Sequence, residues 1–281
     1  MQYVFKQVQI GDTRLAYMEQ GRGESVVLVH GSGATDLRTW GQQIEPFAER
    51  YRVIAYSQRY HYPNPWAGDG SEINSTTVHA GDLAALIAAL QLGRVHLIGF
   101  SYGADIVLRV AVEHPDLVRT LVITEPPLFS WLVTLPRGKG LLDEYGAKIM
   151  PAKERLQNGD LEQGMRLYID GFMGSGVFDQ LPHTVRERIM DNVRLIGTET
   201  ASANEIGPDI TREQAATIQA PVLMLTGSDS SEMFLLVSQE LARYLPRAEQ
   251  VKIDDASHLL HVMNPRAYNA AVLSFLAKHA G

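Results

Sequence analysis

The chain has 281 residues, of which 45% are apolar and 20% charged, and its formal net charge is −7. This balance is ordinary for a soluble globular protein, and without a run of Lys or Arg it argues against nucleic acid and anionic membrane surfaces as partners. The absence of cysteine excludes disulfides, thiol catalysis and thiolate metal sites.

The first half of the chain alternates between strand and helix patterns after an N-terminal hairpin. Apolar runs typical of strands buried on both faces end near His30, Tyr56, Phe100 and Thr124. Helix patterns separate them, the clearest being an amphipathic stretch over 75–92 that Gly93 ends. This alternation predicts a parallel sheet covered by helices.

The alternation stops at Pro126-Pro127 and resumes near Ala220. Residues 129–213 carry mostly helical patterns and no convincing buried strand. A strand over 222–225, a helix, a strand over 250–253 and a last helix then complete the chain. The sequence therefore predicts one α/β core, 1–128 and 214–281, interrupted by an all-helical insert over 129–213.

A Gly-x-Ser-x-Gly pattern joins the strand ending at Phe100 to the next helix. In so tight a strand-to-helix turn, a Cβ at Gly99 or Gly103 would collide with the neighbouring backbone. The turn exposes the hydroxyl of Ser101 and directs the backbone N–H of Tyr102 at whatever Ser101 attacks. Ser101 is therefore the predicted nucleophile.

A serine nucleophile needs a base and a group that orients the base, and both are expected just after strand ends. His258 follows the last predicted strand by a short loop and is the predicted base, with His261 as its rival. For the acid, Asp229 follows the strand over 222–225 and is preferred, while Glu125 at the end of the preceding strand is the main alternative.

A second stretch, His30-Gly31-Ser32-Gly33, follows a strand end. The backbone N–H groups of Ser32 and Tyr102 are the predicted pair of oxyanion donors. A dinucleotide-binding turn would need a third glycine at position 36, which is Asp36.

Together these motifs resemble the α/β-hydrolase superfamily. The resemblance spans about 195 residues of core and places the insert where that family carries a cap or lid. It implies an α/β-hydrolase fold with a mostly parallel sheet, flanking helices and a helical cap. It also implies a serine hydrolase with Ser101, Asp229 and His258 as its triad, without a metal or organic cofactor.

The sequence departs from the family in the loop after the strand ending at Tyr56. Two positions that are glycine in the family are Tyr60 and Tyr62 here. These tyrosines could wall the substrate pocket, although such clusters are more often packed surface. The other predicted pocket residues are Trp131 and Phe172, because specificity is expected in the cap.

The predicted activity is cleavage of a small carboxylic ester through an acyl-enzyme. Ser101 argues against haloalkane dehalogenases and epoxide hydrolases, which carry Asp at the turn. A lactonase, a thioesterase, a carbon–carbon bond hydrolase and a cofactor-free haloperoxidase or perhydrolase stay open, as does a ligand-binding receptor. Without a signal peptide pattern or an apolar run near the roughly 18 residues of a membrane span, a cytoplasmic location is predicted. The sequence leaves the oligomeric state open, a homodimer being one option.

Overall fold

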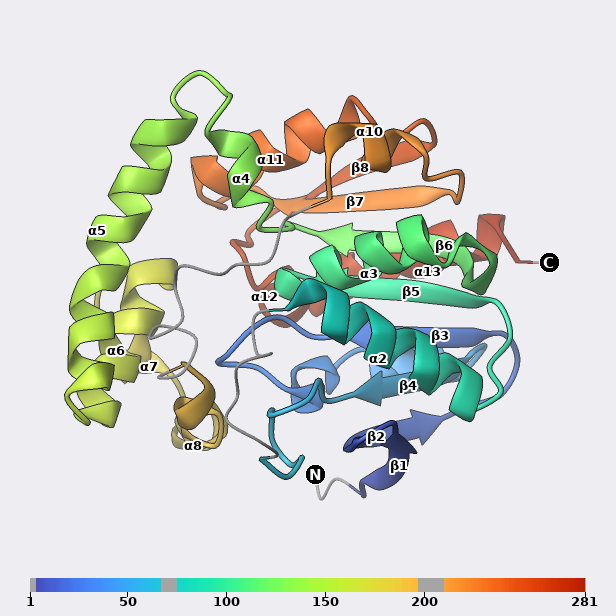
Figure 1. Ribbon diagram of the computed structural model, residues 1–281, viewed down its shortest axis with the longest axis horizontal. Coiled ribbons are helices and arrows are strands. Elements are labelled where there is room, and N and C mark those ends of the chain that lie inside the picture. The colour runs from blue at the N-terminus through green and yellow to red at the C-terminus, as the bar shows by residue number, and fades with distance from the viewer. Residues whose placement is uncertain (1–3, 67–74, 197–209, 281) are drawn as a thin grey trace.

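An eight-stranded sheet forms the centre of the molecule (Figure 1). The computed structural model describes residues 4–66, 75–196 and 210–280. In chain order the strands are β1 (Lys6–Ile10), β2 (Thr13–Gln20), β3 (Ser25–Val29), β4 (Arg52–Tyr56), β5 (Val95–Phe100), β6 (Val118–Thr124), β7 (Val222–Gly227) and β8 (Ala248–Ile253). Their spatial order is β1-β2-β4-β3-β5-β6-β7-β8.

The sheet is parallel from β4 to β8, while β1 and β2 form an antiparallel hairpin at one edge. The central strands β3 and β5 are buried along their whole length. Their continuous apolar runs suit a strand covered on both faces, as the sequence predicted. Because the strands run parallel, β3, β5, β6, β7 and β8 all end at the same edge, so the loops after them lie together.

Helices cover both faces of the sheet and enclose two apolar cores. One core packs under α2 (Thr76–Ala89), α3 (Tyr102–Glu113), α10 (Arg212–Ala216) and α11 (Glu232–Ala242). The other lies under a 3₁₀ helix over Leu37–Trp40, α1 (Ile44–Ala48), α12 (Leu260–Met263) and α13 (Pro265–Lys278), and a second 3₁₀ helix (Pro115–Leu117) precedes β6.

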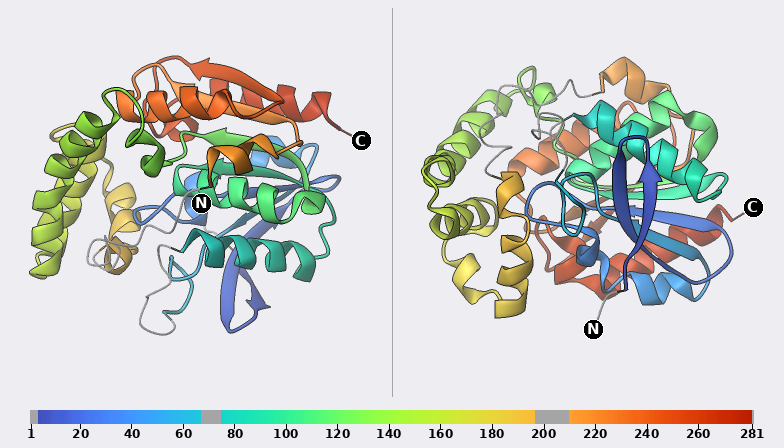
Figure 2. Two further views of the ribbon diagram at one scale, coloured as in Figure 1. Left: turned by 45° about the horizontal axis from the view of Figure 1, so that its top comes forward. Right: turned by 60° about the horizontal axis from the view of Figure 1, so that its bottom comes forward.

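All elements described between β6 and α10 are helices, and residues 197–209 of the predicted insert lie outside the described part. They are α4 (Phe129–Leu132), α5 (Gly138–Gln157), α6 (Leu161–Met173), α7 (Val177–Gln180) and α8 (His183–Met190). These helices stand to one side of the sheet (Figures 1 and 2), and α6, α7 and α8 share a small apolar core of their own. No helix in the described residues is both long and apolar enough to cross a membrane.

A buried asparagine connects the insert to the core. Asn192, just after α8, is 2% exposed. Its side-chain amide donates to Asp36 Oδ2 at 2.9 Å, and its oxygen accepts from the backbone N–H of Tyr62 at 2.8 Å. Arg38 adds a bidentate contact to Asp36 and lies 4.0 Å from the ring centre of Tyr62. This network, built from Asp36, Arg38, Tyr62 and Asn192, fixes one end of the insert on the loops after β3 and β4.

Replacing Asn192 by Ala is therefore expected to lower the free energy of unfolding by about 2–3 kcal/mol, because buried partners lose their hydrogen bonds. Urea unfolding followed by circular dichroism measures this. Asp191→Asn is the matched control: its carboxylate pairs with Arg38 at 2.8 Å but is 39% exposed, so its loss should cost below about 1 kcal/mol. Equal effects of the two variants would contradict this role for Asn192.

Candidate active site

Ser101 occupies a strained turn between β5 and α3. Its backbone has φ 52° and ψ −124°, a conformation that residues other than glycine rarely adopt. A Cβ at Gly99 would lie 2.4 Å from the carbonyl oxygen of Gly103, and a Cβ at Gly103 would lie 2.3 Å from that of Val29. Both glycines are thus required by close backbone approach, as the sequence predicted, and the turn has the geometry of a nucleophile elbow.

The imidazole of His258 is held by a glutamate. His258 follows β8, and its Nδ1 lies 2.7 Å from Glu125 Oε2, whose side chain is fully buried. The other carboxylate oxygen, Oε1, accepts the backbone N–H of Gly227 at 2.9 Å. Because a carboxylate only accepts hydrogen bonds, Nδ1 carries the proton and Nε2 is left as the basic nitrogen.

The structure does not bring Asp229 to His258, contrary to the prediction. Asp229 is exposed, and its Oδ1 accepts from the hydroxyl of Ser228 at 3.0 Å. Glu125 follows β6 directly, with a left-handed φ of 46°. The longer glutamate side chain reaches from β6 to the end of β7 and to His258, and therefore occupies the place expected for Asp229.

Two phenyl rings fix the plane of the His258 imidazole. Phe234 of α11 stacks on it, with ring centres 4.0 Å apart and an interplanar angle of 13°. Phe100, which precedes Ser101, lies 4.9 Å from it at 49°. With Glu125 on Nδ1, the ring has little freedom to turn, and its side chain is 13% exposed. The contact through Phe100 brings the base and the elbow to the same place on the sheet edge.

The loop after β3 packs against the elbow. A Cβ placed on Gly31 would lie 3.2 Å from Cβ of Ser101, so the Gly31-Ser32 backbone passes beside the serine. His30, which is fully buried, supports this loop: its Nε2 accepts the backbone N–H of Gln58 at 3.0 Å and its Nδ1–H donates to the carbonyl of Gly31 at 2.7 Å. Burial lowers the pKa of His30 to about 3, so the ring stays neutral and this pattern of donors persists at neutral pH.

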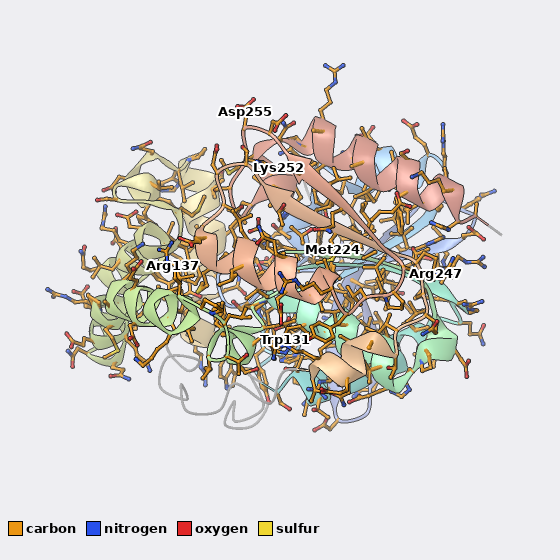
Figure 3. The ribbon with its side chains drawn as sticks, turned by 90° about the horizontal axis from the view of Figure 1, so that it is seen from above. Trp131, Arg137, Met224, Arg247, Lys252 and Asp255 are labelled. Carbon is orange, nitrogen blue, oxygen red and sulfur yellow. The ribbon has the colours of Figure 1, made fainter. Side chains whose placement is uncertain are left out.

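The predicted pocket residues separate into three groups. Tyr60 and Tyr62 line a cavity of about 240 Å³ with Asp191 and Asn192, at the contact between the insert and the core. Trp131, labelled in Figure 3, is 3% exposed, and its indole N–H donates to the carbonyl of Ile210 at 2.8 Å. It lines a second cavity, of about 220 Å³, with Ile210 and Arg212. Phe172 is half-buried, and its ring contacts the rings of Tyr145 and Tyr168.

A model of the family described as alpha/beta hydrolase fold matches residues 24–265. The chain belongs to this α/β-hydrolase family. Among curated relatives of this α/β hydrolase, an (E)-2-((N-methylformamido)methylene)succinate hydrolase of Acinetobacter baylyi is 25% identical, with 97% of this chain and 98% of the relative covered. A 2-hydroxy-6-oxononadienedioate/2-hydroxy-6-oxononatrienedioate hydrolase of Paraburkholderia xenovorans is 27% identical, over 95% and 92% of the two chains.

The fold of the α/β hydrolase also matches solved structures. The enol-lactonase from Burkholderia xenovorans LB400 superimposes with a TM-score of 0.78 at 20% identity, and the match covers 97% of this chain and all of the other. A meta-cleavage product hydrolase superimposes with a TM-score of 0.74 at 17% identity, covering 97% of both chains. At these identities the matches establish the fold alone.

A second histidine of the α/β hydrolase, His261, packs against Phe100, and no hydrogen bond joins His261 to Glu125 among the described residues. His261, the rival base in the sequence, is fully buried, with Nε2 3.0 Å from the hydroxyl of Thr39. Its ring packs between Trp40 and Phe100, with centres 4.6 and 4.7 Å away. Burial, with a smaller contribution from His258, lowers the pKa of His261 to about 3.

This burial makes the stability of the α/β hydrolase sensitive to acid. The unfolded chain protonates His30 and His261 near their ordinary pKa of 6.5, whereas the folded chain does so only near 3. Between these values the unfolded state binds more protons, so the free energy of unfolding falls as pH decreases, by about 2 kcal/mol per histidine at pH 5. Urea unfolding at pH 7.5 and 5.0 measures the loss. His261→Asn is expected to reduce it by about 2 kcal/mol, and an unchanged loss would contradict the assignment.

Proposed function

We propose that the chain is a serine hydrolase that cleaves small carboxylic esters, with Ser101 as nucleophile, His258 as general base and Glu125 as the orienting acid. The observation that carries the proposal is the pair of hydrogen bonds on Glu125. One fixes the carboxylate to Gly227 at 2.9 Å, and the other holds His258 Nδ1 at 2.7 Å. This arrangement leaves Nε2 free to take a proton from a serine that the elbow presents on the same sheet edge.

The reaction would proceed in two halves. His258 Nε2 takes the proton of Ser101 Oγ as the oxygen attacks the ester carbonyl carbon, and the imidazolium then donates this proton to the leaving alcohol. Water, deprotonated by the same nitrogen, attacks the acyl-enzyme and releases the acid. Glu125 stabilises the imidazolium that forms in each half.

The backbone N–H groups of Ser32 and Tyr102 are the proposed donors to the oxyanion. Tyr102 is the first residue of α3, so its N–H lies at the positive end of the helix dipole. Ser32 lies in the loop that passes Cβ of Ser101. Losing one such donor costs about 10²–10³ in turnover in other enzymes.

The bond that is cleaved is tested with a substrate panel. Two curated relatives are hydrolases of different substrates, and one solved structure of similar fold is an enol-lactonase. Hydrolysis is common to the three proteins, while the bond that is cleaved differs. Turnover of p-nitrophenyl acetate and butyrate should exceed that of a γ-lactone, an acyl thioester and a 2-hydroxy-6-oxo dienoate. Preferred turnover of one of the other three would transfer the proposal to that bond, and no turnover of any would reject a hydrolase.

A further inference from the structure

A continuous row of aromatic rings leads from the proposed base into the insert. The first ring is Phe234, which stacks on His258 with centres 4.0 Å apart. Phe129 of α4 follows at 6.0 Å from Phe234, and Tyr145 of α5 at 5.4 Å from Phe129. Two rings of α6 complete the row: Phe172 lies 5.3 Å from Tyr145, and Tyr168 lies 4.9 Å from Phe172. We call these five side chains the aromatic row.

The aromatic row crosses from the core to the insert. Its members come from α11, α4, α5 and α6, which follow one another from the top of the molecule down its left side in Figure 1. Phe234 is buried, whereas the other four rings are half-buried. Phe129, Tyr145 and Phe172 pack against the apolar core under α2 and α3, and Tyr168 packs against the small core of the insert. Each of these four rings is only half-buried, so part of its surface lies outside its core contacts.

The geometry of the aromatic row suits contact with a flat ring of a substrate. The ring pairs are tilted or edge-on, with interplanar angles between 43° and 65°. Aromatic rings favour such offset and edge contacts with a further flat ring. Three of the five side chains are phenyl rings and two are phenols, so the row offers a π surface and contains no cationic side chain.

The end of the row at His258 connects it to the reaction. In the proposed mechanism His258 Nε2 comes within hydrogen-bond reach of the leaving oxygen. A group attached next to the scissile bond is then close to Phe234 and can extend along the neighbouring rings. We infer that the aromatic row is the specificity surface of the enzyme and that its substrate carries an aryl or similarly flat unsaturated group. This inference rests on the proposed function.

The test compares flat and puckered groups of equal carbon number. Two pairs of esters are used: ethyl phenylacetate with ethyl cyclohexylacetate, and phenyl acetate with cyclohexyl acetate. Their kcat/KM ratios are measured by pH-stat for the wild type, Phe129→Leu and Phe172→Leu. The phenyl-to-cyclohexyl ratio of at least one pair should fall about three- to tenfold in both variants, the range that aromatic pair contacts provide. Comparing ratios between variants cancels the different intrinsic reactivity of the esters.

Phe178→Leu is the matched control. Phe178 lies in the insert, is 2% exposed and packs in the small apolar core of α6, α7 and α8, which Tyr168 borders but Phe129 and Phe172 do not. Its replacement should lower the melting temperature and leave both ratios unchanged. If Phe129→Leu and Phe172→Leu behave like Phe178→Leu, the aromatic row is only packing and the inference is overturned.

A binding measurement separates this inference from the proposed function. Calorimetric titration of the same proteins with phenylacetate and cyclohexylacetate needs no turnover. Tighter binding of phenylacetate that is lost in both row variants supports the aromatic row even if no ester is cleaved. Equal binding of the two acids in all proteins, together with unchanged ester ratios, overturns the inference about the aromatic row. Ester turnover by the wild type would still support the proposed function in that case.

Discussion

Ser101→Ala is expected to lower kcat for p-nitrophenyl butyrate by about 10⁴- to 10⁶-fold, because no other group at the elbow can form the acyl-enzyme. The change removes one oxygen from a half-buried residue, so the fold and the melting temperature should be almost unchanged. Initial rates at saturating substrate and thermal melts followed by circular dichroism give both numbers. Activity above a few per cent of the wild type would reject the nucleophile assignment.

Ser101→Gly adds a control that isolates the strain of the turn. Glycine adopts a φ of 52° without the steric cost borne by a side chain, which is on the order of 1–2 kcal/mol. Ser101→Gly should therefore be as inactive as Ser101→Ala but more stable by about 1 kcal/mol. A glycine variant less stable than the alanine variant would show that the turn is not strained at this residue.

Glu125→Gln is expected to lower kcat by about 10⁴-fold, the effect known for an amide in this position of a serine triad. The backbone N–H of Gly227 donates to one side-chain oxygen of residue 125, so the amide oxygen of Gln must face Gly227. The amide nitrogen then faces His258 Nδ1 and donates to it, which moves the imidazole proton to Nε2. A protonated Nε2 cannot take the proton of Ser101.

Asp229→Asn is the matched control for this prediction. Its carboxylate is exposed and contacts only the neighbouring Ser228 among the partners described for it, so kcat should change by less than about threefold, since surface charges act weakly. The two variants are compared in one assay with p-nitrophenyl butyrate. A severe loss in Asp229→Asn with a mild one in Glu125→Gln would return the acid to Asp229.

Much of the fold could be predicted from the sequence because its signals are local. Apolar runs such as the one ending at Phe100 suit only a strand buried on both faces. The glycine spacing of Gly99 and Gly103 predicted the elbow. In the structure a Cβ at either residue would lie within 2.4 Å of a backbone atom. His258 was predicted as the base because the last strand of a parallel sheet ends at the same edge as the elbow.

The acid could not be decided in the same way. Both Glu125 and Asp229 follow strands that end at this edge, on the neighbouring β6 and β7. The choice depends on which carboxylate reaches His258 and is met by a backbone donor, here Gly227. Those are contacts between segments about a hundred residues apart, and no local pattern encodes them.

The surroundings of the base were also beyond local patterns. Phe234 sits in an ordinary helix pattern, and nothing in its neighbourhood predicts that it stacks on His258. Trp131 shows the same limit: its type suggested a pocket residue, but only the structure shows that its indole donates to the carbonyl of Ile210 and that it lines a cavity beside that residue. Such assignments depend on tertiary packing, in which helices of the insert meet helices of the core.

The most direct measurement is to locate a covalent adduct after reaction with a fluorophosphonate, which reacts much faster with a serine activated by a base than with other side chains. Peptide mass spectrometry should find one adduct, on Ser101, in the wild type and in Asp229→Asn, and labelling should be slowed by orders of magnitude in Glu125→Gln. An adduct on another residue, or a wild type that remains unmodified, would contradict the central claim that His258, held by Glu125, activates Ser101.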